Sequence, residues 1–194
     1  MKLLAFDTCC GYFSLVLVDG STVIYSYETA TMHEQSARLV AEIEKGLAAC
    51  SMTYKDLSHI AVTIGPGSFT GIRIGLATAQ GMALALNIPI IGITTLEALA
   101  FGKPDKVIAT LDAGRSQYYC QRFEGGIGDP PALRSAEEIL GFTDYQIVGA
   151  LGADKTLPHA SNVAQAALLK IARNEIIPRP EPYYIRDPDA VKKL

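Results

Sequence analysis

The sequence lacks the residue spacings that build metal centres and disulfide frameworks. Its four cysteines include no C-x-x-C pair, and its three histidines are scattered, with no H-x-x-x-H motif. Cys9 and Cys10 are adjacent in the chain, so they cannot easily bridge each other. We therefore expect reduced, mostly buried thiols and no metal site.

An excess of positive charge is also missing. The chain has 17 Lys and Arg against 20 Asp and Glu, a formal net charge of −3, and charges of both signs are scattered along it. Without a basic stripe, direct capture of nucleic acid through its phosphates is not expected. The apolar start is interrupted by Asp7 and is too short for a signal peptide, and no apolar run approaches the length of a membrane span. We expect a cytoplasmic protein that does not bind membranes.

The first half of the chain begins with three strands that return on one another. Asp19 and Gly20 are a typical two-residue hairpin turn between the second and third strands. The apolar period then changes to that of a helix, which Thr31 and Glu34 open as a capping box. The elements predicted for this half are strands 2–8, 13–19 and 21–28, helix 32–50, strand 59–64, helix 69–87 and strand 88–93.

The second half starts in the same way as the first. Asp112 stands between a strand and a tight turn, as Asp7 does, and Ser135 caps a short helix. The elements predicted for this half are the strand, turn and strand of 109–126, helix 135–138, strand 145–151 and helix 161–175.

This order of elements predicts the fold class. Three antiparallel strands, a helix, a strand, a helix and a strand form the core of ribonuclease-H-like and actin-like ATPase domains. We therefore predict an α/β protein of two duplicated lobes, the second of them reduced. Gly102 and Pro104 break the pattern, so we place the lobes at residues 1–102 and 103–194.

Residues 65–75, GPGSFTGIRIG, follow an apolar strand directly. They are not a P-loop, because Ile72 rather than lysine follows Gly71, and they do not match the Rossmann pattern G-x-G-x-x-G, because the last position is Thr70. A tight turn, Ser68 as the N-cap of a helix and free backbone N–H groups remain, which together make a generic anion site. By itself the loop favours a helix start over a nucleotide cradle.

The helix predicted at 69–87 is apolar around almost its whole circumference. Its polar edge consists of Arg73 and Gln80 alone. One apolar stripe contains glycines that would let another backbone approach closely: Gly71, Gly75, Thr78 and Met82. Two interpretations remain open, a core helix in a tightly packed lobe or a helix that binds a partner protein.

Asp7 and Asp112 are the candidates for chemistry, because an actin-like ATPase holds magnesium with carboxylates from both lobes. Either aspartate can equally cap its own turn. A ribonuclease-H-like nuclease needs three or four converging carboxylates, and residues 59–68 supply none at the end of their strand. Ser68 lacks the G-x-S-x-G spacing of a hydrolase. Two function classes stay open, an assembly subunit and an actin-like ATPase or phosphotransferase that acts on its own.

Four segments resemble the bacterial TsaB family, also called YeaZ, of tRNA threonylcarbamoyladenosine biosynthesis proteins. They are FDT (6–8), HEQSARLVAEI (33–43), GPGSFTGIRIGLATAQGMALALNIPIIGITTLEALA (65–100) and PEPYYIRDPD (180–189). The chain departs from the family pattern at Cys9, where serine is common, and at DAGRSQYY (112–119), where the family has a DARRGEVY-like segment. Its second lobe is also shorter than usual, so the cleft between the lobes is the region of greatest departure.

This resemblance implies an actin-like fold and a non-catalytic role in placing threonylcarbamoyl on the adenosine next to the anticodon of tRNAs. The catalytic subunit TsaD would bind the helices of the first lobe, the ATPase TsaE would join them, and a homodimer would use the same helices when TsaD is absent. The complex alone would contact tRNA. The partner interface would comprise His33, Ser36, Val40, Ile43, Leu47, Phe69, Thr70, Gly71, Ile72, Gly75, Thr78, Ala79 and Met82.

The resemblance implies no cofactor for the isolated chain. A nucleotide site that is vestigial, or that holds ATP or ADP at the interface of the complex, would involve Asp7, Thr8, Gly65, Gly67 and Ser68.

Overall fold

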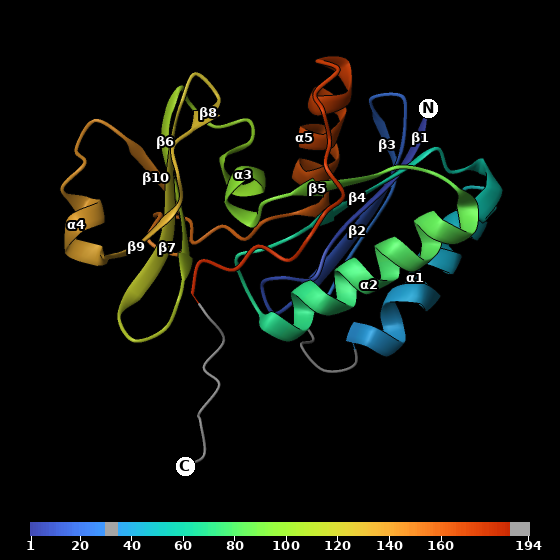
Figure 1. Ribbon diagram of the computed structural model, residues 1–194, viewed down its shortest axis with the longest axis horizontal. Coiled ribbons are helices and arrows are strands. Elements are labelled where there is room, and N and C mark those ends of the chain that lie inside the picture. The colour runs from blue at the N-terminus through green and yellow to red at the C-terminus, as the bar shows by residue number, and fades with distance from the viewer. Residues whose placement is uncertain (30–34, 187–194) are drawn as a thin grey trace, which may run out of the picture.

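The computed structural model of the chain describes residues 1–29 and 35–186 as two β-sheets that lie side by side, with helices on their faces (Figure 1). The first sheet has the strand order β3-β2-β1-β4-β5, and the second has the order β10-β6-β7-β8, with β9 paired to β7. The strands are β1 (Lys2–Asp7), β2 (Phe13–Asp19), β3 (Thr22–Thr29), β4 (His59–Thr63), β5 (Ile90–Ile93), β6 (Lys106–Asp112), β7 (Gln117–Glu124), β8 (Ile127–Gly128), β9 (Ala132–Ser135) and β10 (Gln146–Gly149).

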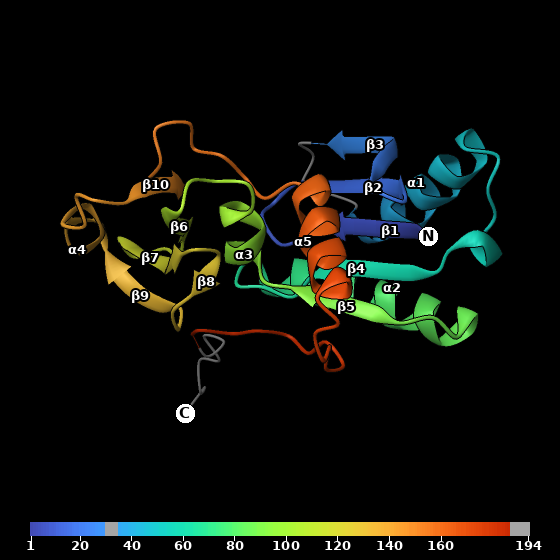
Figure 2. The same ribbon diagram turned by 90° about the horizontal axis from the view of Figure 1, so that it is seen from above.

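The first sheet is covered on both faces, which is why its central strands are apolar throughout. Leu4 and Phe6 of β1 pack into the cluster that contains residues of α1 (Gln35–Ala49) and α2 (Phe69–Leu86). Leu3 and Ala5, which point to the other face because strand side chains alternate, pack against α5 (Ala160–Ala172). Figure 2 shows the layers, with α5 crossing one face of the sheet and the helices α1 and α2 on the other.

The second sheet repeats part of the first. β6 pairs antiparallel with β7 and parallel with β10, as β1 pairs with β2 and β4. The helices that pack on the second sheet are short: α3 (Thr95–Ala100) packs against β6, and α4 (Ala136–Leu140) packs against β7 and β9. The predicted fold class, an actin-like α/β fold of two lobes with the second reduced, is confirmed.

Each half of the chain contributes a helix to the sheet of the other half. α5 follows the second sheet in sequence but packs against β1 and β2, whereas α3 precedes the second sheet in sequence and packs against it. The division of the chain into 1–102 and 103–194 therefore stays a prediction.

Local signals in the sequence located most elements. The hairpin at Asp19–Gly20 joins β2 to β3, and Ser68 and Ser135 are the N-caps of α2 and α4. The capping box expected at Thr31 and Glu34 lies outside the described residues. Four short elements were not predicted: the 3-10 helix at Tyr54–Asp56, α3, β8 and β9.

One expectation about apolar runs was wrong. Among the described residues, α2 is long and apolar enough to cross a membrane by length and composition alone, and 33% of it is buried inside the protein. The core helix of a soluble protein passes the same test, and α2 packs along β4 and β5.

Candidate functional site

The glycine loop before α2 is held tightly against the turn between β1 and β2. The Ser68 backbone N–H donates to the Cys9 carbonyl at 2.7 Å, and the Ser68 hydroxyl accepts from the Gly71 N–H at 3.2 Å. Gly67 has φ +156°, and a Cβ there would lie 2.4 Å from the Cys9 carbonyl oxygen. A side chain at position 67 would therefore separate the loop from the turn. The loop starts a helix, and the predicted N-cap role of Ser68 is confirmed.

Asp7 lies at the end of β1 in a fully buried polar cluster. Its Oδ1 accepts hydrogen bonds from the Cys9 N–H at 3.1 Å and the Thr63 hydroxyl at 2.5 Å, while its Oδ2 has no partner among the described residues. Burial raises the pKa of the Asp7 carboxyl from 3.8 to about 6, although these hydrogen bonds lower it. Burial and the nearby Asp7 carboxylate likewise raise the pKa of the Cys9 thiol, whose Sγ donates to Thr63 Oγ1 at 3.1 Å.

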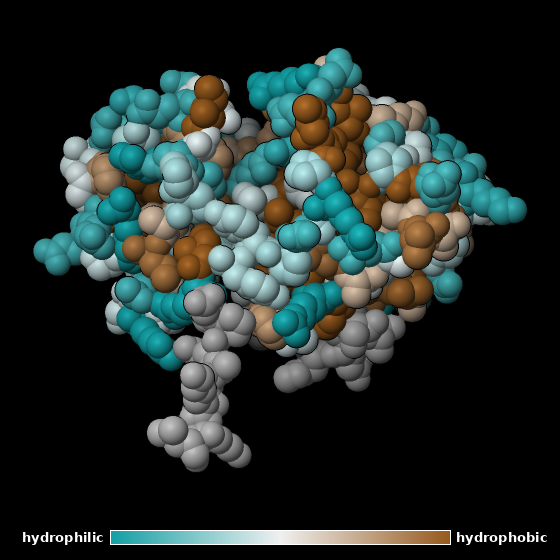
Figure 3. Space-filling view, viewed as in Figure 1, coloured by the Kyte–Doolittle hydropathy of each residue, from teal (hydrophilic) through white to brown (hydrophobic). Residues whose placement is uncertain are grey.

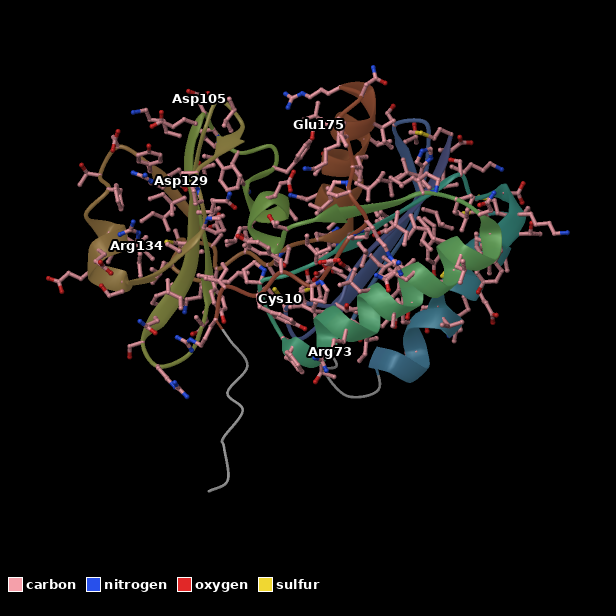
Figure 4. The ribbon with its side chains drawn as sticks, viewed as in Figure 1. Cys10, Arg73, Asp105, Asp129, Arg134 and Glu175 are labelled. Carbon is pink, nitrogen blue, oxygen red and sulfur yellow. The ribbon has the colours of Figure 1, made fainter. Side chains whose placement is uncertain are left out.

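A cleft of about 420 Å³ separates the two sheets beside this cluster. It is lined by Cys9, Cys10, Gly11, Gly67, Ser68, Leu111, Asp112, Ala113, Tyr119, Ala150 and Leu157. Figure 4 shows Cys10 where the two halves of the molecule meet. Among the described residues the lining includes a single carboxylate, Asp112, which also accepts a hydrogen bond from the Gly114 N–H at 2.7 Å and so caps its own turn. No lysine or arginine of residues 1–29 and 35–186 lines the cleft.

The structure brings only part of the predicted nucleotide set to this cleft. Gly67 and Ser68 line it, whereas Asp7, Thr8 and Gly65 do not. Thr8 is buried behind the cleft and donates its hydroxyl to the Gly71 carbonyl at 2.7 Å. Within residues 1–29 and 35–186, no group of three or more His, Cys, Asp and Glu side chains comes together that could hold a metal ion.

The second candidate is the solvent side of α1 and α2, which we call the α2 face. It is defined by five exposed residues that are apolar or small, Val40, Ala77, Gly81, Leu84 and Ala85, while Arg38, Glu44, Lys45 and Arg73 are exposed charged residues of the same two helices. Leu84 is 86% exposed and Val40 is 43% exposed, while a Cβ at Gly81 would meet nothing within 4 Å. In Figure 3, hydrophobic patches alternate with hydrophilic ones over the area where α2 lies. Phe69 and Thr70 are exposed at the N-terminal end of the same helix.

Several residues predicted for the partner interface do not lie on this face, and that part of the prediction was wrong. A Cβ at Gly75 would lie 2.5 Å from Thr8 Oγ1 and 3.3 Å from Val62 Cγ2, because Gly75 faces the sheet. The other residues that are buried in the chain's own core are Ile43, Leu47, Gly71, Ile72 and Ala79. Sheet packing explains the correction, since the glycines of that stripe let the helix approach β1 and β4 rather than a partner.

The rest of the predicted interface divides differently. Val40, Phe69 and Thr70 are exposed, and Thr78 and Met82 are half-buried. Ser36 lies on α1, where its side chain is not described, and His33 lies outside the described residues. Four residues of the α2 face were missed: Ala77, Gly81, Leu84 and Ala85. The signal for them was Arg73, since Ala77 follows it by one turn and Leu84 by three.

Comparisons with known proteins find similarity to a family model described as TsaD and to relatives named TsaB. The model of the family described as TsaD, tRNA N6-adenosine threonylcarbamoyltransferase, matches residues 28–129. The tRNA threonylcarbamoyladenosine biosynthesis protein TsaB of Escherichia coli (strain K12) is 35% identical over 135 residues, 66% of this chain and 58% of that protein. TsaB of Bacillus subtilis (strain 168) is 38% identical over 122 residues, 61% of this chain and 53% of that protein. The chain thus spans about half the length of these relatives.

A solved structure extends the likeness to the whole fold. YeaZ from Pseudomonas aeruginosa superimposes with a TM-score of 0.77 and 24% identity, covering 94% of this chain and 99% of that one. At this identity the superposition establishes the fold.

Proposed function

We propose a function from the premise that this chain belongs to the TsaB (YeaZ) family, whose members are named for the biosynthesis of threonylcarbamoyladenosine in tRNA. In this proposal the chain is a non-catalytic assembly subunit. It binds and stabilises the catalytic subunit TsaD and helps to recruit the ATPase TsaE in the cytoplasm. It contacts tRNA only as part of that complex.

The observation that carries the proposal is the α2 face. A helix that exposes leucine, alanine and glycine to solvent is usually covered by another surface. Gly81, Ala77 and Ala85 follow one another at four-residue spacing, so another helix backbone could come close along that line. We infer that TsaD covers the α2 face, and that a second copy of this chain covers it when TsaD is absent.

The chemistry of the cleft supports a non-catalytic role. Binding a triphosphate requires convergent N–H donors, lysine or arginine, and usually a metal ion between the phosphates. Within the part of the chain that the structure describes, the lining of the cleft offers one carboxylate and no cationic side chain, and the Asp7 carboxyl is buried behind it. We infer that the isolated chain requires no cofactor and that any ATP or ADP is held at the interface of the complex.

The test is a reconstitution of threonylcarbamoyl transfer to tRNA with purified TsaD, TsaE and this chain, supplied with ATP and with an activated threonylcarbamoyl donor whose leaving group is released on transfer. We expect transfer when all three are present, little without this chain, and none from this chain alone. Transfer by TsaD and TsaE that is equally fast without this chain would contradict the proposal. Transfer or ATP turnover by this chain alone would support the alternative of an independent enzyme.

A further inference from the structure

The segment after α5 returns along the molecule and touches both sheets (Figure 1). We call residues 180–186 the C-terminal strap. On the first sheet, the Tyr183 N–H donates to the Ile64 carbonyl at 2.8 Å, and Gln80 Nε2 of α2 donates to the Pro180 carbonyl at 3.1 Å. The strap is therefore bound to the first sheet just beyond the end of β4 and to α2.

The strap also contacts the exposed N-terminal end of α2. The rings of Phe69 and Tyr184 are stacked with centroids 5.3 Å apart, and the guanidinium carbon of Arg73 lies 3.8 Å from the centroid of the Phe69 ring. Arg73 Nε donates to the Tyr184 hydroxyl at 3.4 Å. Phe69 is 38% exposed and Tyr184 is 36% exposed, so this stack is accessible from solvent. Figure 4 shows Arg73 at this end of α2.

The far end of the strap is anchored on the second sheet. Arg186 donates from Nη1 to the Ala113 carbonyl at 2.8 Å and from Nη2 to Gln117 Oε1 at 2.5 Å. Ala113 lies in the turn between β6 and β7, and Gln117 is the first residue of β7. Ile185 packs against the apolar cluster that includes Leu111 of β6. Hydrogen bonds from a charged guanidinium are stronger than neutral ones, so Arg186 is the main polar anchor on this side.

These anchors coincide with the two walls of the cleft. One wall of the cleft includes Gly67 and Ser68. Gly65, at the start of the same loop, lies against the strap, because a Cβ at Gly65 would be 2.6 Å from the Tyr183 carbonyl oxygen. The other wall includes Asp112 and Ala113. The strap is therefore in contact with the segments on both sides of the cleft and with the end of α2 at the same time.

We propose that the C-terminal strap couples the exposed end of α2 to the width of the cleft. Arg186 holds the wall that contains Asp112 and Ala113 toward the wall that contains Gly67 and Ser68. The stack of Tyr184 on Phe69 fixes the position of the strap, and in this position Arg186 reaches the Ala113 carbonyl. A protein that displaces Tyr184 from Phe69 opens the cleft, and a molecule that enters the cleft loosens Tyr184. The coupling is a property of this chain and does not depend on the proposed function.

Alkylation of Cys10 measures the width of the cleft. Cys10 is half-buried in the cleft lining, and burial raises the pKa of its thiol well above the ordinary value, so little reactive thiolate forms while the cleft is closed. Cys50, which follows α1 directly, is an internal reference away from the strap, and the buried Cys120, which is not part of the cleft lining, reports unfolding. Alkylation of each cysteine by N-ethylmaleimide is followed by peptide mass spectrometry.

Arg186→Gln removes the second anchor, Tyr184→Ala removes the stack, and Arg179→Gln is the matched control, because Arg179 is exposed next to the strap. We expect Arg186→Gln and Tyr184→Ala each to raise the alkylation rate of Cys10 at least three-fold relative to that of Cys50. The double variant should raise this ratio little further, because both substitutions detach the same strap. Arg179→Gln should leave the ratio unchanged. An unchanged ratio in either strap variant overturns the proposal, and so does an equal rise in Arg179→Gln or a parallel rise at Cys120.

Discussion

The same substitution at two glycines of α2 should change stability in opposite directions. Gly75 faces the sheet, where an added Cβ would lie 2.5 Å from Thr8 Oγ1, whereas a Cβ at Gly81 would meet nothing within 4 Å. The Thr8 hydroxyl donates to the Gly71 carbonyl at 2.7 Å, so it cannot move aside without loss of a buried hydrogen bond. Gly75→Ala should therefore destabilise the fold, while Gly81→Ala should stabilise it.

The magnitudes follow from three contributions. Alanine in place of glycine favours a helix interior by about 1 kcal/mol at either position. At Gly75, overpacking costs about 1–3 kcal/mol and a broken buried hydrogen bond costs a further ~1 kcal/mol. The net change in the free energy of unfolding is then a loss of roughly 1–3 kcal/mol for Gly75→Ala and a gain of up to about 1 kcal/mol for Gly81→Ala.

Thermal melting followed by circular dichroism gives the comparison, with the three proteins at one concentration and their oligomeric state checked by light scattering. In a chain of this length 1 kcal/mol corresponds to about 2–4 °C in Tm. Gly75→Ala should melt at least a few degrees below the wild type and Gly81→Ala slightly above it. Shifts of the same sign in both variants would refute the assignment of the buried and exposed sides of α2.

Three further predictions concern Asp7 and the isolated chain. Because the pKa of Asp7 is raised from 3.8 to about 6 in the fold, the folded state binds this proton more tightly than the unfolded chain, so its contribution to stability is lost as the pH rises from about 4 through 6. Between pH 4 and 7.5 the wild type should thus lose roughly 2–2.5 kcal/mol of unfolding free energy relative to Asp7→Asn in urea titrations, and parallel curves would contradict the buried, desolvated carboxyl. The purified chain should not hydrolyse ATP at a meaningful rate, and magnesium-dependent turnover that disappears in Asp7→Asn would overturn this expectation. The chain alone should bind tRNA weakly at physiological salt, because its net charge is −3. Tight binding with a steep salt dependence in a filter assay would contradict the proposal that the chain contacts tRNA only as part of the complex.

The order of strands and helices could be predicted because its signals are local. The alternation and hairpin turn of residues 13–28, the N-cap at Ser68 and the apolar period of 161–175 each depend on a few neighbouring residues. The sheet against which a helix packs is not a local property. α5 follows the second sheet in sequence and packs on the first, and no pattern within the helix records that choice.

The orientation of α2 was harder to predict because three of its stripes are apolar. Glycine at position 75 indicated close approach by a backbone or side chain, but the residue that approaches is Thr8 from the chain's own β1 end. Arg73 was the better guide, since a charged residue on an apolar helix faces solvent and fixes the exposed side. The C-terminal strap has neither helical nor strand periodicity, so its contacts with Phe69 and Ala113 could be seen only in three dimensions.

The central claim is that the α2 face is the surface that TsaD covers, and the most direct test compares two exposed leucines. Leu84 lies on that face and is 86% exposed, whereas Leu140 is 57% exposed on α4, at the other end of the molecule (Figure 1). Burial of one leucine at an interface contributes about 1.5–3 kcal/mol, and an unpaired carboxylate in its place costs more. In a calorimetric titration with TsaD, we predict that Leu84→Asp weakens binding at least ten-fold and that Leu140→Asp binds as the wild type does. Equal affinity of Leu84→Asp and wild type, with both proteins folded, would contradict the claim.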